Sequence, residues 1–570
     1  MEKSPQGIFK KGRNLHMILS KIVSSMDKCF LDDAIAAHTA VKSVSMLRNQ
    51  HLSLQLAYTE TESVAAHHRR VKVRVLGELA PYVRIRRVEN VPVTFPAYQT
   101  RHDDNYLRTT PGLYPDVLLP LSYHESVVLS AGHTRALWLD FEPKGALPAG
   151  DYDTTVELYE MTAEGEHVHT SQTVKIHIVG ADLPENQLYV TQWFHCDCLA
   201  QYYGVEALSE RHWEIIENFA RTAVENGINL LLTPIFTPAL DTYIGGERLT
   251  VQLVGVKRDG ADYTFDFTLL DRWIEMCNRV GIKYFEVAHL FTQWGAAHAP
   301  KVMATVDGEY RKLFGWETDA TGDEYATFLR TFLPAFLDHM KARGDDKRCL
   351  FHISDEPNET HLEQYSKSKA VVADILKDYI IMDALSNFEF YQQGVVKTPI
   401  PSNNHIKPFL DAKVPDLWTY YCCGQNVGVS NRFIAMPGAR TRCIGMQFFK
   451  FDIAGFLQWG YNYYNNIGSH DPINPYLETC GEYFYPAGDG FSVYPAADGT
   501  AHESMRILQF REGLEDCAAM KLAASIYGKD AVVAEMEKLV GEIRFDKCLR
   551  MPQNMLAVRD AVNAMIERAL

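Results

Sequence analysis

Two neighbouring carboxylates, Asp355 and Glu356, end a short apolar run at residues 349–357, Cys-Leu-Phe-His-Ile-Ser-Asp-Glu-Pro. The apolar side chains of the run favour burial, whereas carboxylates are costly to bury unless they are paired or hydrogen-bonded. Pro357 has no backbone N–H and ends the strand ladder. Two carboxylates at the tip of a buried strand repel each other, so their pKa values are pushed apart, which suits acid/base chemistry near neutral pH.

The same residues also allow a purely structural interpretation. In that interpretation Asp355 caps a helix beginning near His361, and Glu356 is solvated. The apolar run before the pair favours the functional interpretation, and the rest of the chain must then supply elements that position the two carboxylates.

Composition excludes several classes of protein. The chain has 570 residues, 46% of them hydrophobic, which predicts two or three globular domains. The formal charge of −16 argues against nucleic acid as a partner. The first 30 residues contain no signal-peptide-like apolar segment, and no run is long enough to span a membrane, so a cytoplasmic protein is expected.

Cysteine usage and motif content indicate neither a metal nor a cofactor. The eleven cysteines suggest free thiols, and the close pairs Cys196/Cys198 and Cys422/Cys423 lack zinc-site spacing. No dinucleotide-binding, P-loop, zinc-protease or serine-hydrolase motif occurs at a usable position. The oligomeric state stays open.

The N-terminal part of the chain has the pattern of a strand-rich domain. Residues 1–45 are expected to form an N-terminal extension, mildly helical over 33–44, and residues 46–184 a β-sandwich. Alternation of apolar and polar residues predicts strands over 71–76, 82–88, 134–140, 154–159 and 174–179.

The pattern changes near residue 184, where apolar strands begin to alternate with amphipathic helices. Strands are expected at 188–194, 228–235, 283–290, 350–353, 380–384, 417–421, 455–459 and 490–494. This order favours a (β/α)8 TIM-type barrel over residues 185–525. A doubly wound open sheet is the alternative, because periodicity cannot prove closure. Residues 526–570 are expected to be C-terminal helices packed on the barrel.

In a barrel of this kind, functional residues lie at the carboxyl ends of the strands. Polar and aromatic residues occur at these expected positions. The candidate substrate-binding residues are His195, Asp197, Asp383, Trp418, Tyr420, Trp459, Tyr461 and Asn462. Each one taken alone is more often a core or structural residue, so the inference rests on their joint placement.

A barrel mouth lined by carboxylates and aromatic rings suits a sugar. Ordinary retaining glycosidases place two carboxylates about 5 to 5.5 Å apart on opposite sides of the anomeric carbon, and inverting ones place them further apart. Sequence neighbours cannot easily straddle a sugar in that way. Substrate assistance by a 2-acetamido group removes the need for an enzyme nucleophile. Glu356 would then be the general acid/base and Asp355 would hold the acetamido N–H, with Tyr420 or Tyr461 donating to its oxygen.

The chain resembles glycoside hydrolase family 123. The matching motifs are Ser354-Asp-Glu-Pro357, Pro115-Asp-Val-Leu-Leu-Pro120, Trp193-Phe-His195, Trp418-Thr-Tyr-Tyr-Cys422, Gly455-Phe-Leu-Gln-Trp-Gly-Tyr-Asn462, and Gly488-Asp-Gly490 followed by Arg506 and Arg511-Glu-Gly513. The resemblance covers about residues 50 to 520. It implies an exo-acting, retaining β-N-acetylgalactosaminidase in which Asp355 and Glu356 occupy the two catalytic positions, and a glycan with terminal β-linked N-acetylgalactosamine as the substrate.

Two other hypotheses are kept. The first is a glycosidase of another specificity that pairs Glu356 with a separated carboxylate, Asp383, Asp197 or Asp489. The second is a non-catalytic glycan-binding protein with a degenerate barrel. The sequence does not locate the contact to the sugar O4 that separates galacto from gluco substrates.

Overall fold

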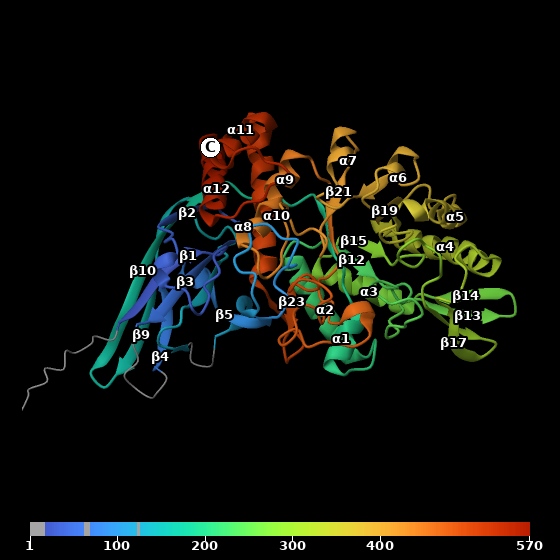
Figure 1. Cartoon of the computed structure of the whole chain (residues 1–570), viewed down its shortest axis with the longest axis horizontal. Helices are drawn as coiled ribbons and strands as arrows, with labels where there is room; N and C mark the ends of the chain where they lie inside the picture. Colours follow the sequence, from blue (N-terminus) through green and yellow to red (C-terminus); the bar gives the residue numbers. More distant parts are fainter. Residues whose placement is uncertain (1–16, 62–68, 122–125) are drawn as a thin grey trace, which may run out of the picture.

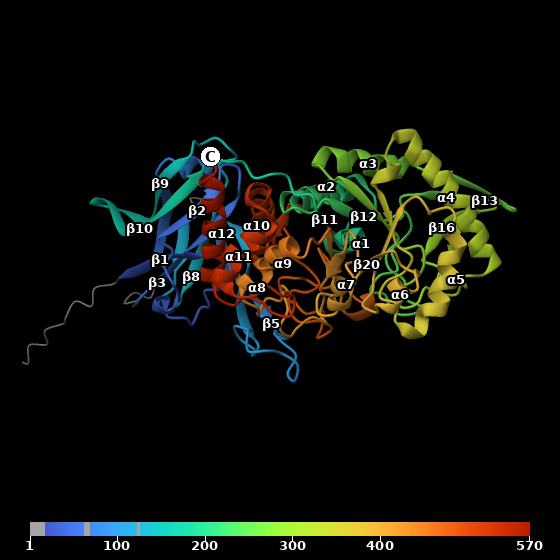
Figure 2. The ribbon, with the colours of Figure 1, turned by 90° about the horizontal axis from the view of Figure 1, so that it is seen from above.

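The computed structural model describes residues 17–61, 69–121 and 126–570. A strand-rich region lies at one end of the long axis and a region of mixed helices and strands at the other, with the C-terminal helix α12 beside the strand-rich region (Figures 1 and 2). Among the described helices, none is both long and apolar enough to cross a membrane.

The strand-rich region contains two five-stranded sheets. In spatial order the first sheet has β1 (Ile18–Ser24), β3 (Leu52–Glu60), β8 (Arg135–Phe141), β5 (Val83–Val93) and β6 (Gly112–Pro120). The second has β2 (Ser43–Leu47), β10 (Gly165–Val179), β9 (Gly150–Thr162), β4 (Arg69–Leu76) and β7 (Ser126–Leu129). The strands predicted at 71–76, 82–88, 134–140, 154–159 and 174–179 overlap β4, β5, β8, β9 and β10.

The prediction for the start of the chain is wrong within the described residues. The helix expected over 33–44 is reduced to the 3-10 turn η1 (Ile35–Ala37). Strand β1 pairs antiparallel with β3, and β2 pairs parallel with β10, so both belong to the sheets rather than to an extension. The partners lie far along the chain, and such long-range pairing overrides weak local preference. Residues 1–16 of the expected extension lie outside the described residues.

The mixed region contains two sheets of parallel strands. One sheet has, in spatial order, β12 (Leu230–Thr233), β15 (Tyr284–Val287), β18 (Cys349–Phe351), β19 (Ile380–Ala384) and β20 (Thr398–Ile400). The other has β11 (Tyr189–Gln192), β22 (Gly455–Gln458) and β21 (Trp418–Tyr420). A parallel bridge between Ser402 and Tyr420 links β20 to β21, and Asn229 N–H donates to the Val190 carbonyl, 3.1 Å, where β12 meets β11.

Helices follow the parallel strands along the chain. They are α1 (Cys196–Tyr203), α2 (Glu210–Glu225), α3 (Thr268–Val280), α4 (Asp323–Arg343), α5 (Leu362–Val372), α6 (Glu389–Gln392), α7 (Lys407–Asp411), α8 (Gly438–Arg442) and α9 (Ile444–Lys450). Two long connections form a separate four-stranded sheet of β13 (Gly255–Asp259), β14 (Asp262–Asp266), β16 (Val302–Val306) and β17 (Glu309–Phe314).

Two strand predictions for the mixed region need correction. The strand expected at 490–494 is β23 (Val493–Pro495), which pairs antiparallel with β24 (Ala501–Glu503) and takes no part in the parallel sheets. The sequence analysis missed β20, which pairs with β19 instead. A three-residue strand containing Pro399 shows neither a period nor a typical strand composition.

Three helices close the chain, α10 (Met505–Tyr527), α11 (Lys529–Val540) and α12 (Pro552–Glu567). The expectation that the last helices pack on the barrel is incomplete, because α12 docks on the strand-rich region. Asp560 accepts hydrogen bonds from Ser45 N–H, 2.8 Å, and Ser45 Oγ, 2.6 Å, on β2. Asn563 Nδ2 donates to the same Ser45 Oγ, 3.0 Å.

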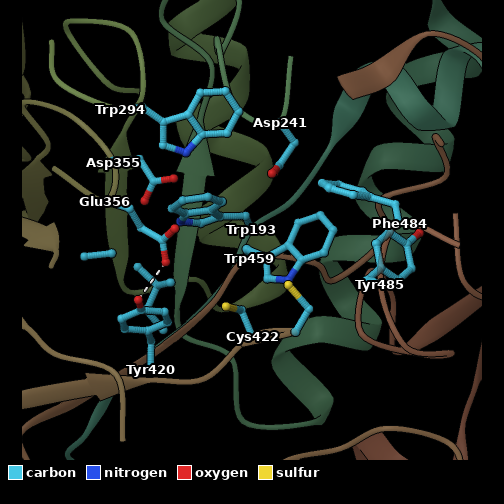
Figure 3. A pocket seen from close by; sticks show the side chains of 13 residues that line it. Trp193, Asp241, Trp294, Asp355, Glu356, Tyr420, Cys422, Trp459, Phe484 and Tyr485 are labelled. Carbon is cyan, nitrogen blue, oxygen red and sulfur yellow. Dashed lines mark hydrogen bonds between the residues drawn. The ribbon is translucent and has the colours of Figure 1, made fainter. Parts of the chain in front are cut away.

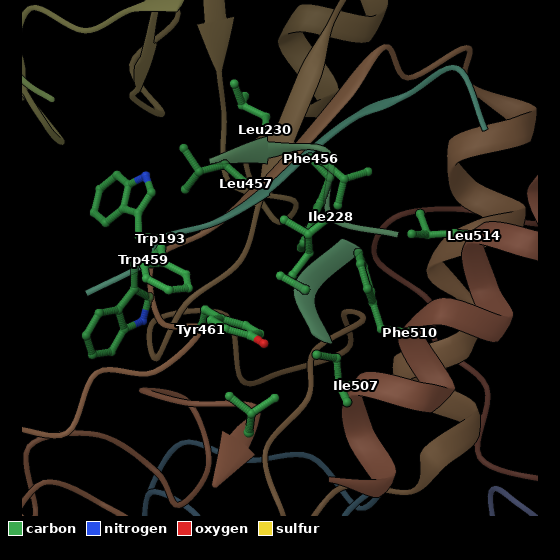
Figure 4. Close-up of a cluster of buried hydrophobic side chains, with 14 of the residues drawn as sticks. Trp193, Ile228, Leu230, Phe456, Leu457, Trp459, Tyr461, Ile507, Phe510 and Leu514 are labelled. Carbon is green, nitrogen blue, oxygen red and sulfur yellow. The ribbon is translucent and has the colours of Figure 1, made fainter. Parts of the chain in front are cut away.

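Helix α10 packs against the base of the parallel strands. Its side chains pack with side chains of β12, of β22 and of residues next to β11, β12 and β22 in one buried cluster (Figure 4). Labelled members of this cluster are Trp193, Ile228, Leu230, Phe456, Leu457, Trp459, Tyr461, Ile507, Phe510 and Leu514. This packing ties the helix to the strands whose far ends carry the site described below.

A buried ion pair joins the strand-rich region to α10. Asp116 on β6 accepts from Arg506 Nε, 2.8 Å, and Nη2, 2.9 Å, and from the Tyr494 hydroxyl, 2.6 Å. Lys28 Nζ lies 3.7 Å from the same carboxylate. Burial lowers the pKa of Lys28 to about 8, and Asp116 opposes that change. The two regions therefore share a charged cluster that has no access to water.

Replacing Asp116 should destabilise the protein strongly. Asp116→Ala leaves the Arg506 and Lys28 cations buried without a counter-ion, so we expect a loss of about 3–5 kcal/mol in the free energy of unfolding. The matched control is Asp374→Ala, which breaks an exposed pair with Arg330 and should cost about 0–1 kcal/mol. Urea unfolding of both variants measures the difference, and equal losses would contradict the prediction.

Candidate active site

A cavity, open to solvent at its mouth, lies at the carboxyl ends of the parallel strands. Asp355 and Glu356 follow β18, Tyr420 ends β21 and Trp459 follows β22. The full lining is Trp193, Asp241, Trp294, Asp355, Glu356, Ala384, Tyr420, Cys422, Cys423, Leu457, Trp459, Phe484 and Tyr485 (Figure 3).

The backbone of the carboxylate pair and of the two residues before it is held by hydrogen bonds to β19. Asp383 on β19 accepts from Ile353 N–H, 3.0 Å, and from Ser354 N–H, 3.3 Å. Within the pair, Glu356 N–H donates to the Ala384 carbonyl, 3.0 Å. Strand β19 therefore fixes the end of the β18 segment that delivers the pair to the cavity.

A backbone turn directs both carboxylates into one cavity. Neighbouring side chains of an extended strand point to opposite faces. Glu356, however, has a φ of +43°, in the left-handed region that is costly for residues other than glycine. Its side chain lies on the same side as that of Asp355, and Glu356 Oε1 accepts from the Tyr420 hydroxyl, 2.6 Å (Figure 3). The strained backbone at Glu356 therefore allows both side chains to point into the same cavity.

The cavity favours the protonated form of its carboxyl groups. Burial raises the pKa of Asp355 well above its usual value, and the neighbouring charges of Glu356 and Asp241 raise it further. Burial also raises the pKa of Glu356, although the hydrogen bond from Tyr420 opposes the change. Because the two carboxyl groups interact closely, they titrate together, and the pair retains a proton at a higher pH than a solvated carboxyl group would.

Asp241, in the segment after β12, is a third carboxyl group in the cavity that the sequence analysis missed. It faces the Asp355–Glu356 pair from the other side (Figure 3). Its Oδ2 is buried and has no hydrogen-bond partner among the described residues. Burial raises its pKa to about 7, and the charge of Glu356 adds to this effect. No pattern around Asp241 marked it, because the residue lies in an irregular connection.

Aromatic rings form much of the cavity wall. Trp193 Nε1 donates to buried Glu286, 2.8 Å, and Trp459 Nε1 donates to buried Asp489, 2.8 Å, so both indole rings are held in place. Trp294 is 45% exposed and lies at the mouth. Trp193 near the end of one expected strand and Trp294 after another were visible in the sequence, but neither was chosen as a site residue.

Two of the predicted substrate-binding residues, Tyr420 and Trp459, line the cavity. His195, Asp197 and Asn462 do not. His195 Nε2 donates to the Trp459 carbonyl, 2.9 Å, and its N–H donates to Asn462 Oδ1, 2.9 Å. Asp197 forms a two-point ion pair with Arg248, with both distances 2.7 Å. Burial lowers the pKa of His195 to about 3. These three side chains hold the loops around the cavity instead.

Tyr461, Trp418 and Asp383 are also placed away from the cavity. The Tyr461 hydroxyl donates to the Phe219 carbonyl, 2.9 Å, and its ring is fully buried. Trp418 stacks on Tyr189 with ring centroids 5.2 Å apart. Asp383 and Tyr461 lie near carboxyl ends of strands as expected, whereas Trp418 begins β21 and so lies at its amino end. Spacing along the sequence does not say whether a side chain faces the cavity or the surrounding core.

The one described group of His, Cys, Asp and Glu side chains close enough to hold a metal ion is His289, His352 and Asp383, with ligand atoms within 4.8 Å of one another. Both nitrogens of His352 are engaged, by Glu286 at 2.7 Å and by Asp383 at 3.3 Å. The rings of His289 and His352 stack with centroids 4.2 Å apart, which suits packing better than chelation. We therefore interpret the group as a structural network.

Comparison with known proteins agrees with this architecture. Residues 193–523 match the family model "Glycoside hydrolase 123, catalytic domain". The structure is similar to that of a family 123 glycoside hydrolase from Clostridium perfringens, studied for glycolipid glycan hydrolysis, with a TM-score of 0.70, 12% identity, and coverage of 97% of this chain and 98% of that one. A GH10 xylanase from Thermobacillus composti is matched with a TM-score of 0.29, 11% identity, and coverage of 57% of this chain and 96% of that one. A score that low supports no conclusion. No curated protein matches the sequence.

The match to the catalytic-domain model spans more than half of the sequence. The chain therefore belongs to glycoside hydrolase family 123, as the sequence motifs suggested, and the cavity is the candidate active site of a glycosidase.

The third carboxyl group should make stability depend on pH. The pKa of Asp241 is raised from 3.8 to about 7, so its stabilising contribution is complete below pH 3.8, declines as the pH rises from there, and is fully lost once the pH has passed 7. Asp241→Asn mimics the protonated form. We expect this variant to unfold at a higher temperature than the wild type at pH 8 and to differ less at pH 5. Exposed Asp416→Asn is the control, and a difference for Asp241→Asn that does not vary with pH would contradict the assignment.

Proposed function

We propose that this family 123 glycosidase releases terminal β-linked N-acetylgalactosamine from glycans, with retention of configuration and assistance from the substrate's 2-acetamido group. The observation that carries the proposal is the shared direction of Asp355 and Glu356, two sequence neighbours that line one cavity. A pair on one side of the sugar leaves the opposite face of the anomeric carbon to the acetamido oxygen.

The separated carboxylates that the sequence offered as partners of Glu356 do not fit a conventional mechanism. Asp383 and Asp197 are outside the cavity lining. Asp489 is fully buried and accepts from Trp459 Nε1, 2.8 Å. This distribution supports substrate assistance, because no carboxylate from that set can attack the anomeric carbon.

In the proposed reaction Glu356 acts first as an acid and then as a base. Its proton passes to the leaving glycosidic oxygen while the acetamido oxygen bonds to the anomeric carbon, which gives an oxazolinium-type intermediate. Glu356 then takes a proton from water, the water oxygen bonds to the anomeric carbon, and the ring opens to restore the acetamido group. A raised pKa favours the protonated form that the first step needs.

Asp355 is proposed to hold the acetamido N–H. In the free cavity burial and the nearby charges favour its protonated form. An N–H that donates to the carboxylate favours the ionised form, and the positive charge that develops on the acetamido group stabilises it further. Binding of the substrate would therefore ionise Asp355 as the reaction begins.

Tyr420 is our candidate donor to the acetamido oxygen. Its hydroxyl donates to Glu356 in the free cavity, so it becomes available when Glu356 is protonated and turns toward the leaving oxygen. Tyr461, the second candidate from the sequence, is withdrawn because its hydroxyl is buried against the Phe219 carbonyl.

The proposal extends to the fold and the substrate. We interpret the parallel strands β11, β12, β15, β18, β19, β20, β21 and β22 as a closed (β/α)8 barrel, supported by the links at Ser402/Tyr420 and Asn229/Val190. The two N-terminal sheets are interpreted as a β-sandwich. Because the similar Clostridium perfringens enzyme was studied for glycolipid glycan hydrolysis, glycolipid headgroups are one class of glycan to test.

A second candidate is a glycosidase that uses Glu356 with a carboxylate across the cavity. Asp241 is the residue that favours it, because it faces the pair and lacks a partner for Oδ2 among the described residues. An inverted product would support this alternative. A non-catalytic glycan-binding protein has no such support, because both proposed catalytic carboxyl groups line the cavity.

A paired substrate assay tests the proposal. The enzyme should hydrolyse an aryl β-N-acetylgalactosaminide, and its kcat/KM for the matching β-galactoside should be lower by at least about 100-fold, since only the former supplies the acetamido nucleophile. Proton NMR of the first-formed product should show the β-anomer. Equal cleavage of the two glycosides would remove the acetamido group from the mechanism.

Substitution of the two carboxyl groups should separate their roles. Glu356→Gln should lower kcat by about 10²–10⁴-fold for poor leaving groups and by less for activated aryl groups, which need no acid. Asp355→Asn should lower kcat by about 10²–10³-fold even with activated leaving groups, because it weakens charge stabilisation in the first step. Glu363→Gln, exposed on α5, is the control. Undiminished turnover by Asp355→Asn would exclude Asp355 from the mechanism.

A further inference from the structure

Asp241 is presented to the cavity on a rigid backbone. Its N–H donates to Gln293 Oε1, 2.7 Å, and its carbonyl accepts from Ser469 Oγ, 2.8 Å. The residue also has a φ of +48°, a conformation that costs free energy in any residue but glycine. Contacts from two separate segments thus hold the backbone that carries the carboxyl group, as a recognition group requires.

The carboxyl group itself has an unmet hydrogen-bonding demand. Oδ2 is buried and has no partner among the described residues. Arg248, whose charge acts on Asp241, directs its guanidinium to Asp197, with both distances 2.7 Å, and to the Leu240 carbonyl, 3.0 Å. A buried acceptor that lacks a donor is unfavourable, and a ligand O–H entering the cavity would satisfy it.

The location of Asp241 indicates which part of a sugar it would meet. It faces the Asp355–Glu356 pair across the cavity, with the indole of Trp193 beside the space between them (Figure 3). Under the proposed function Glu356 contacts the glycosidic oxygen on the anomeric carbon, and Asp355 contacts the 2-acetamido group. The ring carbon opposite the anomeric carbon in a pyranose is C4, so the hydroxyl there points toward the far wall.

We propose that Asp241 is a specificity-determining residue that accepts a hydrogen bond from the 4-hydroxyl of the terminal N-acetylhexosamine. This inference rests on the proposed function and supplies the contact that separates galacto from gluco substrates. The two sugars differ only in the orientation of that hydroxyl, so a fixed acceptor favours one of them. Asp241 takes no part in bond breaking.

The kinetic test compares each variant on substrates with and without the 4-hydroxyl. Asp241→Ala should lower kcat/KM for the preferred aryl β-N-acetylhexosaminide by about 10–100-fold, because the 4-hydroxyl is then buried without its hydrogen-bond partner. For its 4-deoxy analogue the loss should be under about 3-fold. The ratio of kcat/KM between the galacto and gluco substrates should move toward one. Asp241→Asn keeps the shape of the side chain and one acceptor, and should give an intermediate loss.

The matched control is Asp416→Ala. Asp416 has the same φ of +48°, but it is exposed in the turn before β21, so its substitution measures the effect of removing a carboxylate from a left-handed residue alone. It should leave kcat/KM unchanged for every substrate. Thermal unfolding of each variant shows whether it is folded before it is assayed.

A binding measurement separates this inference from the proposed function. In the Glu356→Gln background, calorimetry with N-acetylgalactosamine, N-acetylglucosamine and the 4-deoxy sugar reports recognition without turnover. Weaker binding on Asp241→Ala of only the 4-hydroxyl sugars supports the inference even where the wild type hydrolyses neither N-acetylhexosaminide. Equal losses for 4-hydroxyl and 4-deoxy sugars would overturn it. Azide rescue of Asp241→Ala with a glycosyl azide as product would also overturn it, since azide then replaces a carboxylate that acts as nucleophile or general base.

Discussion

The carboxylate of Asp383 is the interaction on which the site most depends. It is fully buried on β19 and accepts from Ile353 N–H and Ser354 N–H, the two residues before the catalytic candidates. Tyr365 also donates to it. A carboxylate in that position would be costly without these donors. The hydrogen bonds to Asp383 thus offset the cost of burying its carboxylate, and they also fix the position of the residues that follow β18.

The network continues beneath the cavity through His352. Although burial alone would lower it, the hydrogen bonds to Asp383 and Glu286 raise the pKa of His352 to about 9, so the ring is a cation between two carboxylates. Glu286 in turn accepts from Trp193 Nε1, 2.8 Å, which fixes one wall of the cavity. One buried chain of charges therefore positions both the carboxylate pair and an aromatic wall of the cavity, while the strained turn at Glu356 lets both carboxylates face inward.

Motifs that are far apart in the sequence meet at the boundary between the two regions. Arg506 on α10 donates to Asp116 on β6 and to the Gly488 carbonyl, 2.6 Å. These residues come from two of the motifs that resemble family 123. The contact between these residues gives a physical reason why the resemblance extends beyond the catalytic domain. The strand-rich region supplies the counter-ion for Arg506 on α10, and α10 packs against the parallel strands.

Local patterns in the sequence determined a large part of this protein. The apolar run ending in Asp355 and Glu356, the alternating strands of the N-terminal region and most of the parallel strands depend on neighbouring residues, so they could be predicted. The three-residue strand β20 and the pairing of β1 and β2 could not, since their partners are distant in the sequence.

Only the tertiary structure decided which side chains face the cavity. His195, Tyr461 and Asn462 stand near strand ends as expected, yet their polar atoms are used by the surrounding backbone. Asp241, which no pattern marked, faces the carboxylate pair instead. The sequence by itself marked the pair as the candidate for acid/base chemistry, because that prediction depends only on adjacent residue types. The position of Asp241 on the opposite wall depends on how the irregular connection after β12 folds over the strands. Contacts between distant segments determine that conformation, and no local sequence pattern encodes them.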